Sequence, residues 1–323
     1  MASVDTVLGP IDTGDLGRVL MHEHVFVLGE ELRENYPGFP TRWDEELRVD
    51  DAIAKLRALS ERGIDTIVDP TVIGLGRYIP RIRRIAEHTD INILVATGLY
   101  TYNELPFQFH YVGPGLLFDA PEPLTELFVR DIREGIADTG VKAAMLKCAI
   151  EAQGLTPGVE RVMRAVGRAH VETGVPITVH TNPHSESGLV AQKVLAEEGV
   201  DLTKVVIGHS GDSTDLDYLR KIADAGSILG MDRFGLDLLL PFEERIATVA
   251  ALAELGYADR MVLAHDASCF IDWFPHDVKE LAVPNWNYNH ISDDVLPVLR
   301  ERGVSDEQIT TMLVDNPRRF FES

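Results

Sequence analysis

The sequence is short of cysteine, of long apolar runs and of any leader-like segment. Its two cysteines, Cys148 and Cys269, form neither a disulfide framework nor a C-x-x-C motif, so we expect free thiols in a reducing compartment. No apolar run approaches the roughly 18 residues that a transmembrane helix requires. The opening M-A-S-V-D-T-V-L-G has neither the basic nor the apolar region of a signal peptide. We therefore expect a cytoplasmic protein.

Positive charge is also scarce. The 323 residues include 30 basic and 52 acidic side chains, which give a formal net charge of −22. Such a surface repels nucleic acid and anionic membranes, so we exclude both as partners and expect a small-molecule substrate. Hydrophobic residues make up 45% of the chain, enough for a large core, and no Ser/Gly-rich linker divides it. We expect a single domain over residues 1–323.

The sequence does contain a repeating strand–helix rhythm. Eight Val- and Ile-rich segments read as buried parallel strands: V-L-M-H-E-H-V from Val19, then residues 65–70, 92–100, 143–148, 176–181, 204–210, 227–234 and 260–266. Helical patterns fill the spacers, for example over 50–63, 157–174 and 187–199. This rhythm predicts an α/β protein with a (β/α)8 TIM barrel. We expect a short N-terminal hairpin within the first 17 residues, and a C-terminal helical segment from Pro284 with a helix near 306–314.

Two histidines interrupt the first apolar segment, V-L-M-H-E-H-V-F-V. On a strand, His22 and His24 point to the same face with their Cβ atoms about 6.6 Å apart, close enough for both rings to reach one metal ion. Glu23 points to the opposite face. Taken alone, the motif leaves two readings open: a metal site, or two polar residues at a strand end.

Polar residues at the ends of other predicted strands favour the metal reading. They are Lys147, His180, His209 and Asp266. In a TIM barrel the carboxyl ends of all strands meet at one face, and burying such a cluster without a metal would cost on the order of several kcal/mol. Imidazole and carboxylate are ligands of Zn-type divalent ions. Lys147 either reaches solvent to pair with surplus acid or, as a free amine, takes up CO2 to give a carbamate that can bridge two ions.

These segments resemble a known family. G-R-V-L-M-H-E-H-V over residues 17–25 and L-K-C-A around Lys147 resemble the two signatures of the phosphotriesterase family of the amidohydrolase superfamily, with Val19 where the first signature usually has Thr. V-I-G-H-S-G-D and L-A-H-D also match, so the resemblance covers essentially the whole chain. It implies two divalent ions, with zinc expected and Co, Mn and Fe also suited. It also implies a homodimer.

The resemblance further implies how the ligands divide. One ion is held by His22, His24 and Asp266, the other by His180 and His209, and carboxylated Lys147 and a hydroxide bridge the two. We expect the hydroxide to attack a metal-polarised C=O or P=O group, and Asp266 to accept its proton. Asp232 and Asp212 are candidates for orienting the ligand histidines.

Aromatic and basic residues after strands 3, 7 and 8 resemble the lactonase branch of this family. There, the residues matching Tyr100 and Arg233 sit beside the lactone ring, and we expect both to be catalytic and substrate-binding, with Tyr102 as a further substrate contact. Phe270 and Trp273 are expected to line an acyl-chain channel. The simpler readings are a core tyrosine, an arginine paired with acid, and hydrophobic cover.

The sequence thus predicts a binuclear-metal hydrolase that opens lactones, above all N-acyl-homoserine lactones in quorum quenching, with secondary organophosphate triesterase activity. The first alternative is another amidohydrolase, acting on cyclic amides or mainly on phosphotriesters. A deaminase fits less well, because that chemistry on this fold typically uses one metal without a bridging lysine such as Lys147. The second alternative, of a different class, is a metal-loaded barrel that binds a hydrophobic ligand without turnover.

Overall fold

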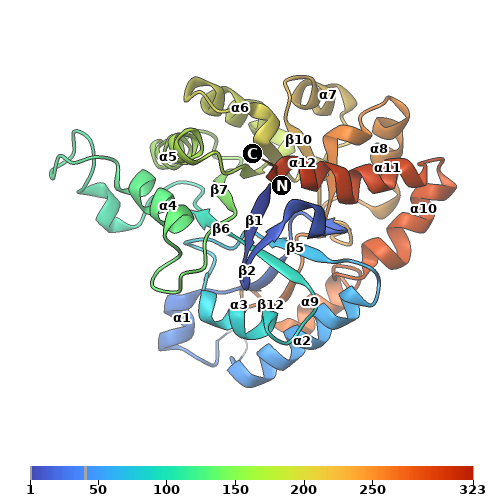
Figure 1. Cartoon of the computed structure of the whole chain (residues 1–323), viewed down its shortest axis with the longest axis horizontal. Coiled ribbons are helices and arrows are strands. Elements are labelled where there is room, and N and C mark those ends of the chain that lie inside the picture. The colour runs from blue at the N-terminus through green and yellow to red at the C-terminus, as the bar shows by residue number, and fades with distance from the viewer. Residues whose placement is uncertain (1, 40–41, 323) are drawn as a thin grey trace.

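A computed structural model describes residues 2–39 and 42–322. Eight parallel strands form one sheet in the order β11-β10-β9-β8-β7-β6-β5-β3. They are β3 (Val19–Leu20), β5 (Thr66–Asp69), β6 (Asn92–Gly98), β7 (Met145–Ile150), β8 (Ile177–Thr181), β9 (Val205–Gly208), β10 (Ile228–Met231) and β11 (Met261–Leu263). The sheet curls into a barrel surrounded by helices, which confirms the predicted (β/α)8 fold (Figure 1).

The barrel closes between the first and last strands. Met21 N donates to Leu263 O at 3.3 Å, and His24 N donates to Ala267 O at 2.8 Å. Two further short strands, β4 (His24–Val27) and β12 (Ser268–Ile271), continue this seam in parallel pairing. Between these two hydrogen bonds the chain advances by three residues on the first strand and by four on the last. The one extra residue defines a β-bulge. The prediction of one unbroken strand through His22 is wrong, since residues 21–23 form the break that the bulge imposes.

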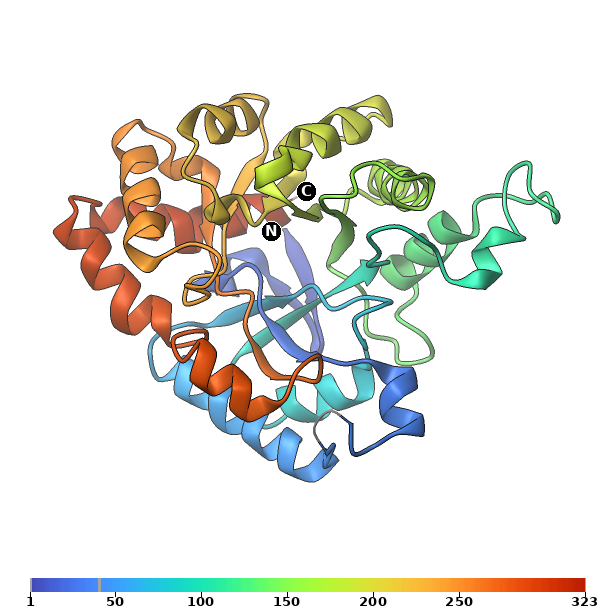
Figure 2. The ribbon, with the colours of Figure 1, turned by 180° about the vertical axis from the view of Figure 1, so that it is seen from behind.

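Helices cover the outside of the barrel (Figures 1 and 2). They are α1 (Glu30–Asn35), α2 (Glu45–Ser60), α3 (Ile79–Ala86), α4 (Pro123–Arg133), α5 (Pro157–Thr173), α6 (Ser187–Glu197), α7 (Leu216–Asp224) and α8 (Phe242–Glu254). Helix α5 has the predicted ends: the Thr156 side chain accepts from Val159 N, and Gly174 is left-handed. Helix α2 begins five residues before the predicted start because Asp44 caps it, accepting from Leu47 N at 3.1 Å.

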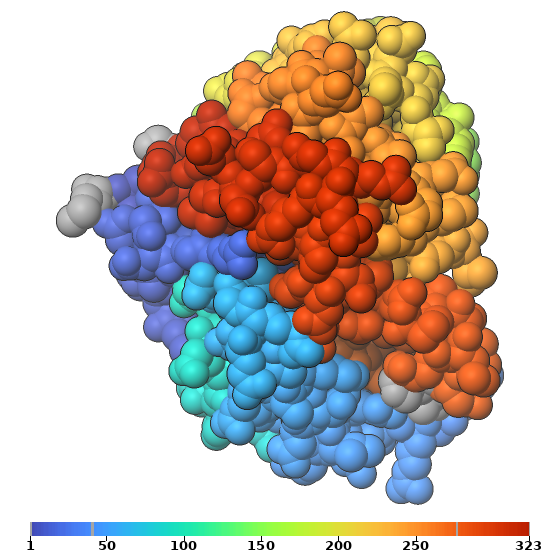
Figure 3. Space-filling view, turned by 90° about the vertical axis from the view of Figure 1, so that its right-hand side faces the viewer, coloured from blue at the N-terminus to red at the C-terminus, as the bar shows by residue number. Residues whose placement is uncertain are grey.

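The predicted C-terminal helical segment is present and longer than expected. After β12 come α9 (His276–Ala282), α10 (Leu296–Glu301), α11 (Asp306–Thr310) and α12 (Asn316–Phe321). Wider π turns, Ile291–Val295 and Thr311–Asp315, precede α10 and α12, because Pro297 and Pro317 lack the N–H that a regular turn would use. The segment lies against α2 (Figure 3), and Arg62, just after that helix, pairs with Asp293 at 2.9 Å.

The predicted N-terminal hairpin is confirmed. Strands β1 (Ser3–Thr6) and β2 (Gly9–Asp12) pair antiparallel. The two ends of the chain lie close together in front of the barrel in Figure 1, and Thr13 Oγ1 donates to Glu322 Oε1 at 3.4 Å. The hairpin therefore covers one end of the barrel together with the last helix.

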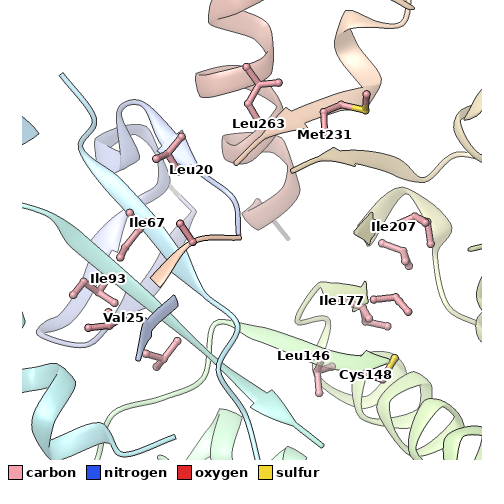
Figure 4. Packing of buried hydrophobic residues seen from close by; sticks show 14 of the residues in the cluster. Leu20, Val25, Ile67, Ile93, Leu146, Cys148, Ile177, Ile207, Met231 and Leu263 are labelled. Carbon is pink, nitrogen blue, oxygen red and sulfur yellow. The ribbon is translucent and has the colours of Figure 1, made fainter. Parts of the chain in front are cut away.

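Buried side chains form two apolar clusters that follow the alternation of the strands. Leu20, Ile67, Ile93, Leu146 and Leu263 belong to the cluster between the sheet and the helices (Figure 4). Their neighbours on the same strands belong to a second cluster, which fills the barrel interior: Val19, Val68, Leu94, Met145 and Val262. None of the described helices has the length and apolar character needed to cross a bilayer.

Candidate active site

The carboxyl ends of the strands surround a cavity of about 440 Å³. Its inner wall carries His22, His24, Lys147, His180 and Asp266, which are five of the six predicted metal ligands. The sixth, His209, is fully buried beside them, with Nε2 at 2.7 Å from His180 Nδ1. The structure therefore brings together all six side chains from five different strand ends.

One group of ligand atoms centres on Asp266. His22 Nε2 and His24 Nε2 each lie 3.3 Å from Asp266 Oδ1. Together these three residues could hold a metal ion. Lys147 Nζ lies 3.3 Å from His22 Nε2, at the edge of the same group. The His24 ring is fixed from behind by Thr71, whose Oγ1 is 2.7 Å from His24 Nδ1.

The second group consists of His180 and His209 with two carboxylates behind them. Asp232 accepts hydrogen bonds from the backbone N–H and the Nδ1 atom of His209, both at 2.9 Å. The other oxygen of Asp232 lies 3.3 Å from His22 Nδ1, so one carboxylate contacts rings of both groups. Glu151 Oε1 lies 3.1 Å from His180 Nε2. Asp212, the other residue predicted to orient a ligand histidine, pairs instead with Arg233 and Arg245.

Burial prepares these groups for a cation. It lowers the pKa of Lys147 to about 8 and, together with the Lys147 charge, that of His22 to about 3. Burial opposes ionisation of Asp266, but the nearby His22 and His24 hold the pKa of its carboxyl well below the usual range. A neutral His22 imidazole, an ionised carboxylate and an amine that loses its proton readily are states that a divalent metal requires. Burial opposes protonation of His24, but hydrogen bonds to Asp266 and Asp69 raise its pKa, so this ring would bind an ion by losing its proton. The residues present fit such an ion.

Three of these strand ends adopt a left-handed backbone that non-glycine residues rarely use. His209, Arg233 and Asp266 have φ values of 62°, 65° and 52°, and they follow β9, β10 and β11. Each such residue costs on the order of 1 kcal/mol or more, and it persists where surrounding contacts fix it. The strain is concentrated where the side chains converge.

The chain matches known proteins along its whole length. The family model described as "Phosphotriesterase family" matches residues 2–321. The chain belongs to the phosphotriesterase family. Membership implies a divalent metal centre, which the His and Asp groups described above could form, and it supports a metal-dependent hydrolase.

Relatives in the family include both organophosphate and lactone enzymes by name. A "Phosphotriesterase homology protein" of Mycobacterium tuberculosis is 59% identical over 100% of this chain and 98% of its own. A solved structure of the phosphotriesterase from M. tuberculosis superposes with a TM-score of 0.97, covering 99% of this chain and 98% of that one. An "Aryldialkylphosphatase" of Saccharolobus solfataricus is 41% identical over 96% of both chains. A structure described as an engineered organophosphate hydrolase from "a Weak Promiscuous Lactonase Template" is 34% identical, with a TM-score of 0.90 and 99% of both chains covered.

In this family member the predicted substrate contacts Tyr100, Tyr102, Arg233 and Trp273 all line the cavity. Arg233 donates from Nε to Asp266 Oδ2 at 3.0 Å and from Nη1 to Asp212 Oδ2 at 2.8 Å. The Tyr100 and Tyr102 hydroxyls are hydrogen-bonded to each other, and each lies 3.3 Å from a ring nitrogen of His180. Trp273 is 54% exposed at the rim.

Phe270 does not line the cavity, so the prediction that it contacts the acyl chain is wrong. Its side chain is buried in the cluster between sheet and helices, beside the Trp43 ring and 4.0 Å beneath the Arg48 guanidinium. The β12 strand turns this ring toward α2, and the apolar wall of the cavity comes instead from Ile271, Phe274, Val278 and Val283.

Sequence reasoning missed the residues that hold the site from behind. Thr71 and Glu151 contact His24 and His180, and each follows the end of a strand, β5 or β7. That position was a usable signal. Arg245 gives no such signal, because it lies within α8. It is nevertheless fully buried, pairs with Asp212 at 2.6 Å and donates to Gly211 O and Leu240 O.

Proposed function

We propose that this protein is a lactonase that opens lactones with long apolar substituents, with N-acyl-homoserine lactones as the expected class and quorum quenching as the consequence. The observation that carries the proposal is the cavity itself. One end holds the His/Asp/Lys cluster, and the wall above it is apolar, with Leu236, Leu239, Ile271 and Val283 among its lining residues. Such a cavity suits a polar reacting group attached to a hydrocarbon chain.

The metal centre in this proposal uses all six convergent side chains. His22, His24 and Asp266 would hold one divalent ion and His180 and His209 the other, and Lys147, as a carbamate formed with CO2, would supply a further carboxylate ligand. Zinc is the expected metal. When bound, the ions lower the pKa of a water molecule and polarise the carbonyl of the substrate.

The protein side chains supply orientation and proton transfer. Asp266 accepts a proton as the water oxygen bonds to the carbonyl carbon. Arg233 holds that carboxylate from its other oxygen, at 3.0 Å. Burial and the adjacent Tyr102 raise the pKa of Tyr100, so its hydroxyl stays protonated and donates a hydrogen bond to the lactone. The ring C–O bond then breaks, and the proton from Asp266 passes to the leaving alkoxide to give a hydroxy acid.

A substrate comparison tests this proposal. One zinc-reconstituted preparation is assayed for kcat/KM on homoserine lactones of short and long acyl chain, a γ- or δ-lactone, a cyclic amide and a phosphotriester. Lactones are expected to lead by orders of magnitude, with the rate rising with chain length and a weaker triesterase activity. A lead by the triester or the amide would make that reaction the main one. No turnover with tight lactone binding would leave a binding protein.

The family resemblance also leads us to propose a homodimer. Sedimentation velocity of the metal-loaded protein tests this, with a single species of twice the 35.8 kDa chain mass as the expected result. A species of monomer mass at assay concentration would contradict it.

A further inference from the structure

Glu23 lies between two ligand-type histidines and faces away from the cavity. It is fully buried. Its Oε1 accepts hydrogen bonds from the backbone N–H of His265 at 2.8 Å and from His265 Nδ1 at 2.6 Å. Its Oε2 accepts from the backbone N–H of Ala267 at 3.2 Å. The Glu23 carboxyl group therefore accepts backbone hydrogen bonds from the residues immediately before and immediately after Asp266.

Asp266 needs such support. Its φ of 52° lies in the left-handed region, and it sits in the bulge where the barrel closes. Its own N–H donates to His22 O at 3.0 Å, so all three backbone N–H groups from 265 to 267 bond to residues 22 and 23. Turning Asp266 to an ordinary conformation would break bonds on both sides of it.

We propose that Glu23 is a positioning residue: it fixes the backbone on both sides of Asp266 and thereby aims that carboxylate at the His22 and His24 rings. This inference rests on the proposed role of Asp266 as ligand and proton acceptor. This role explains the pattern of the segment from His22 to His24. The two histidines face the cavity as ligands, and Glu23 faces the neighbouring strand and holds the backbone around Asp266.

The hydrogen-bond network of Glu23 and His265 extends to the C-terminal segment. His265 Nε2 accepts a hydrogen bond from Ile291 N at 2.9 Å, and Trp286 Nε1 donates to His265 O at 2.8 Å. The His265 ring is thus held on one nitrogen by Glu23 and on the other by the tail. This fixes the ring that provides one of the three donors to Glu23.

Asn316 provides a matched control at the amino end of β11, the strand that leads to Asp266. It is also fully buried, and its Nδ2 donates to Ala258 O at 2.9 Å and to Met261 O at 2.6 Å. Glu23→Gln and Asn316→Asp are both isosteric and both place a wrong polar atom against fixed backbone partners. Each is expected to cost stability, but only one of them adjoins Asp266.

The test compares zinc affinity, measured by competition with a chromophoric chelator, and melting temperature in the three full-length proteins. Glu23→Gln is expected to weaken zinc binding by about 10- to 100-fold, as loss of a group that orients a ligand does, and to shift the pH profile of kcat. Asn316→Asp is expected to lower the melting temperature alone. Equal loss of stability in both variants, with unchanged zinc affinity in Glu23→Gln, would overturn the proposal.

Two further arms keep the result decisive. If Glu23→Gln does not fold, Glu23→Asp is used; its shorter carboxylate cannot reach both flanking N–H groups, so zinc affinity should fall below wild type, and unchanged affinity would again overturn the proposal. The zinc measurement needs no substrate. A wild-type protein that fails to hydrolyse lactones would refute the proposed function while leaving this readout intact.

Discussion

The two ends of the barrel are built on opposite principles. At the amino end, the buried interior cluster includes Leu16, Phe320 and Phe321. Lys204 caps the carboxyl end of α12 by donating from Nζ to Arg319 O at 2.9 Å. At the carboxyl end, the interior holds imidazoles, carboxylates and a lysine with lowered pKa. Three of the five non-glycine residues with left-handed backbone in the described ranges, His209, Arg233 and Asp266, also lie there.

The difference shows where this sequence gives up stability. Each buried charge and each left-handed residue lowers the free energy of unfolding, whereas apolar packing raises it. The amino end therefore supports the fold, and the carboxyl end uses part of that stability to hold functional groups in place. This division predicts that changes at the carboxyl end lower activity and changes at the amino end lower stability.

The largest effect is expected from metal removal. Exhaustive chelation should lower hydrolysis by about a thousandfold or more, because the ions supply several kcal/mol of transition-state stabilisation. It should also lower the melting temperature, since the ions bind only the folded state. Hydrogen exchange of the β1–β2 hairpin should stay unchanged below the transition. Full activity in a preparation shown by elemental analysis to be metal-free would refute the metal centre.

Asp266→Asn should give the next largest loss. Removing the proton acceptor is expected to lower kcat by about 10²- to 10⁴-fold, with the fold intact by circular dichroism. The matched control is Asp259→Asn, on an exposed side chain just before β11 at the amino end of the same strand. That variant should keep wild-type kcat. Undiminished turnover in Asp266→Asn would remove the carboxylate from the mechanism.

Much of this contrast could be predicted from the sequence. The strand–helix rhythm predicted the barrel, and the polar residues that end its strands, His180 and His209 among them, predicted which side chains converge. The reason is that both inferences use local periodicity and one topological rule, that parallel strands end at the same face. Neither requires knowledge of side-chain packing.

What could not be predicted depends on three-dimensional packing. The bulge at Asp266 arises where the first and last strands meet, which is a contact across some 240 residues that no local pattern encodes. Phe270 reads as a channel residue by sequence and packs against α2 instead. Arg245 is a charged residue within a helix, and only the fold reveals that it is buried against Asp212.

At the amino end, Phe320→Ala should affect stability alone. Phe320 is 1% exposed, and truncating such a ring typically costs about 3–5 kcal/mol of unfolding free energy. Urea denaturation measures this loss. The same protein assayed at low temperature, where it remains folded, should keep the wild-type kcat/KM. A loss of kcat in fully folded Phe320→Ala would show that the two ends are coupled.

The smallest effect, and the sharpest probe of the boundary between the two principles, is expected at the cavity rim. Trp273 is 54% exposed, so its truncation should change stability little. If it covers an acyl chain, Trp273→Ala should lower kcat/KM for long-chain lactones by about tenfold, the equivalent of roughly 1.4 kcal/mol of lost apolar contact. Short-chain lactones should be unaffected. The control is Leu281→Ala on α9, which is 84% exposed and outside the cavity lining. Equal losses for both chain lengths would place Trp273 with the reacting groups rather than with the channel.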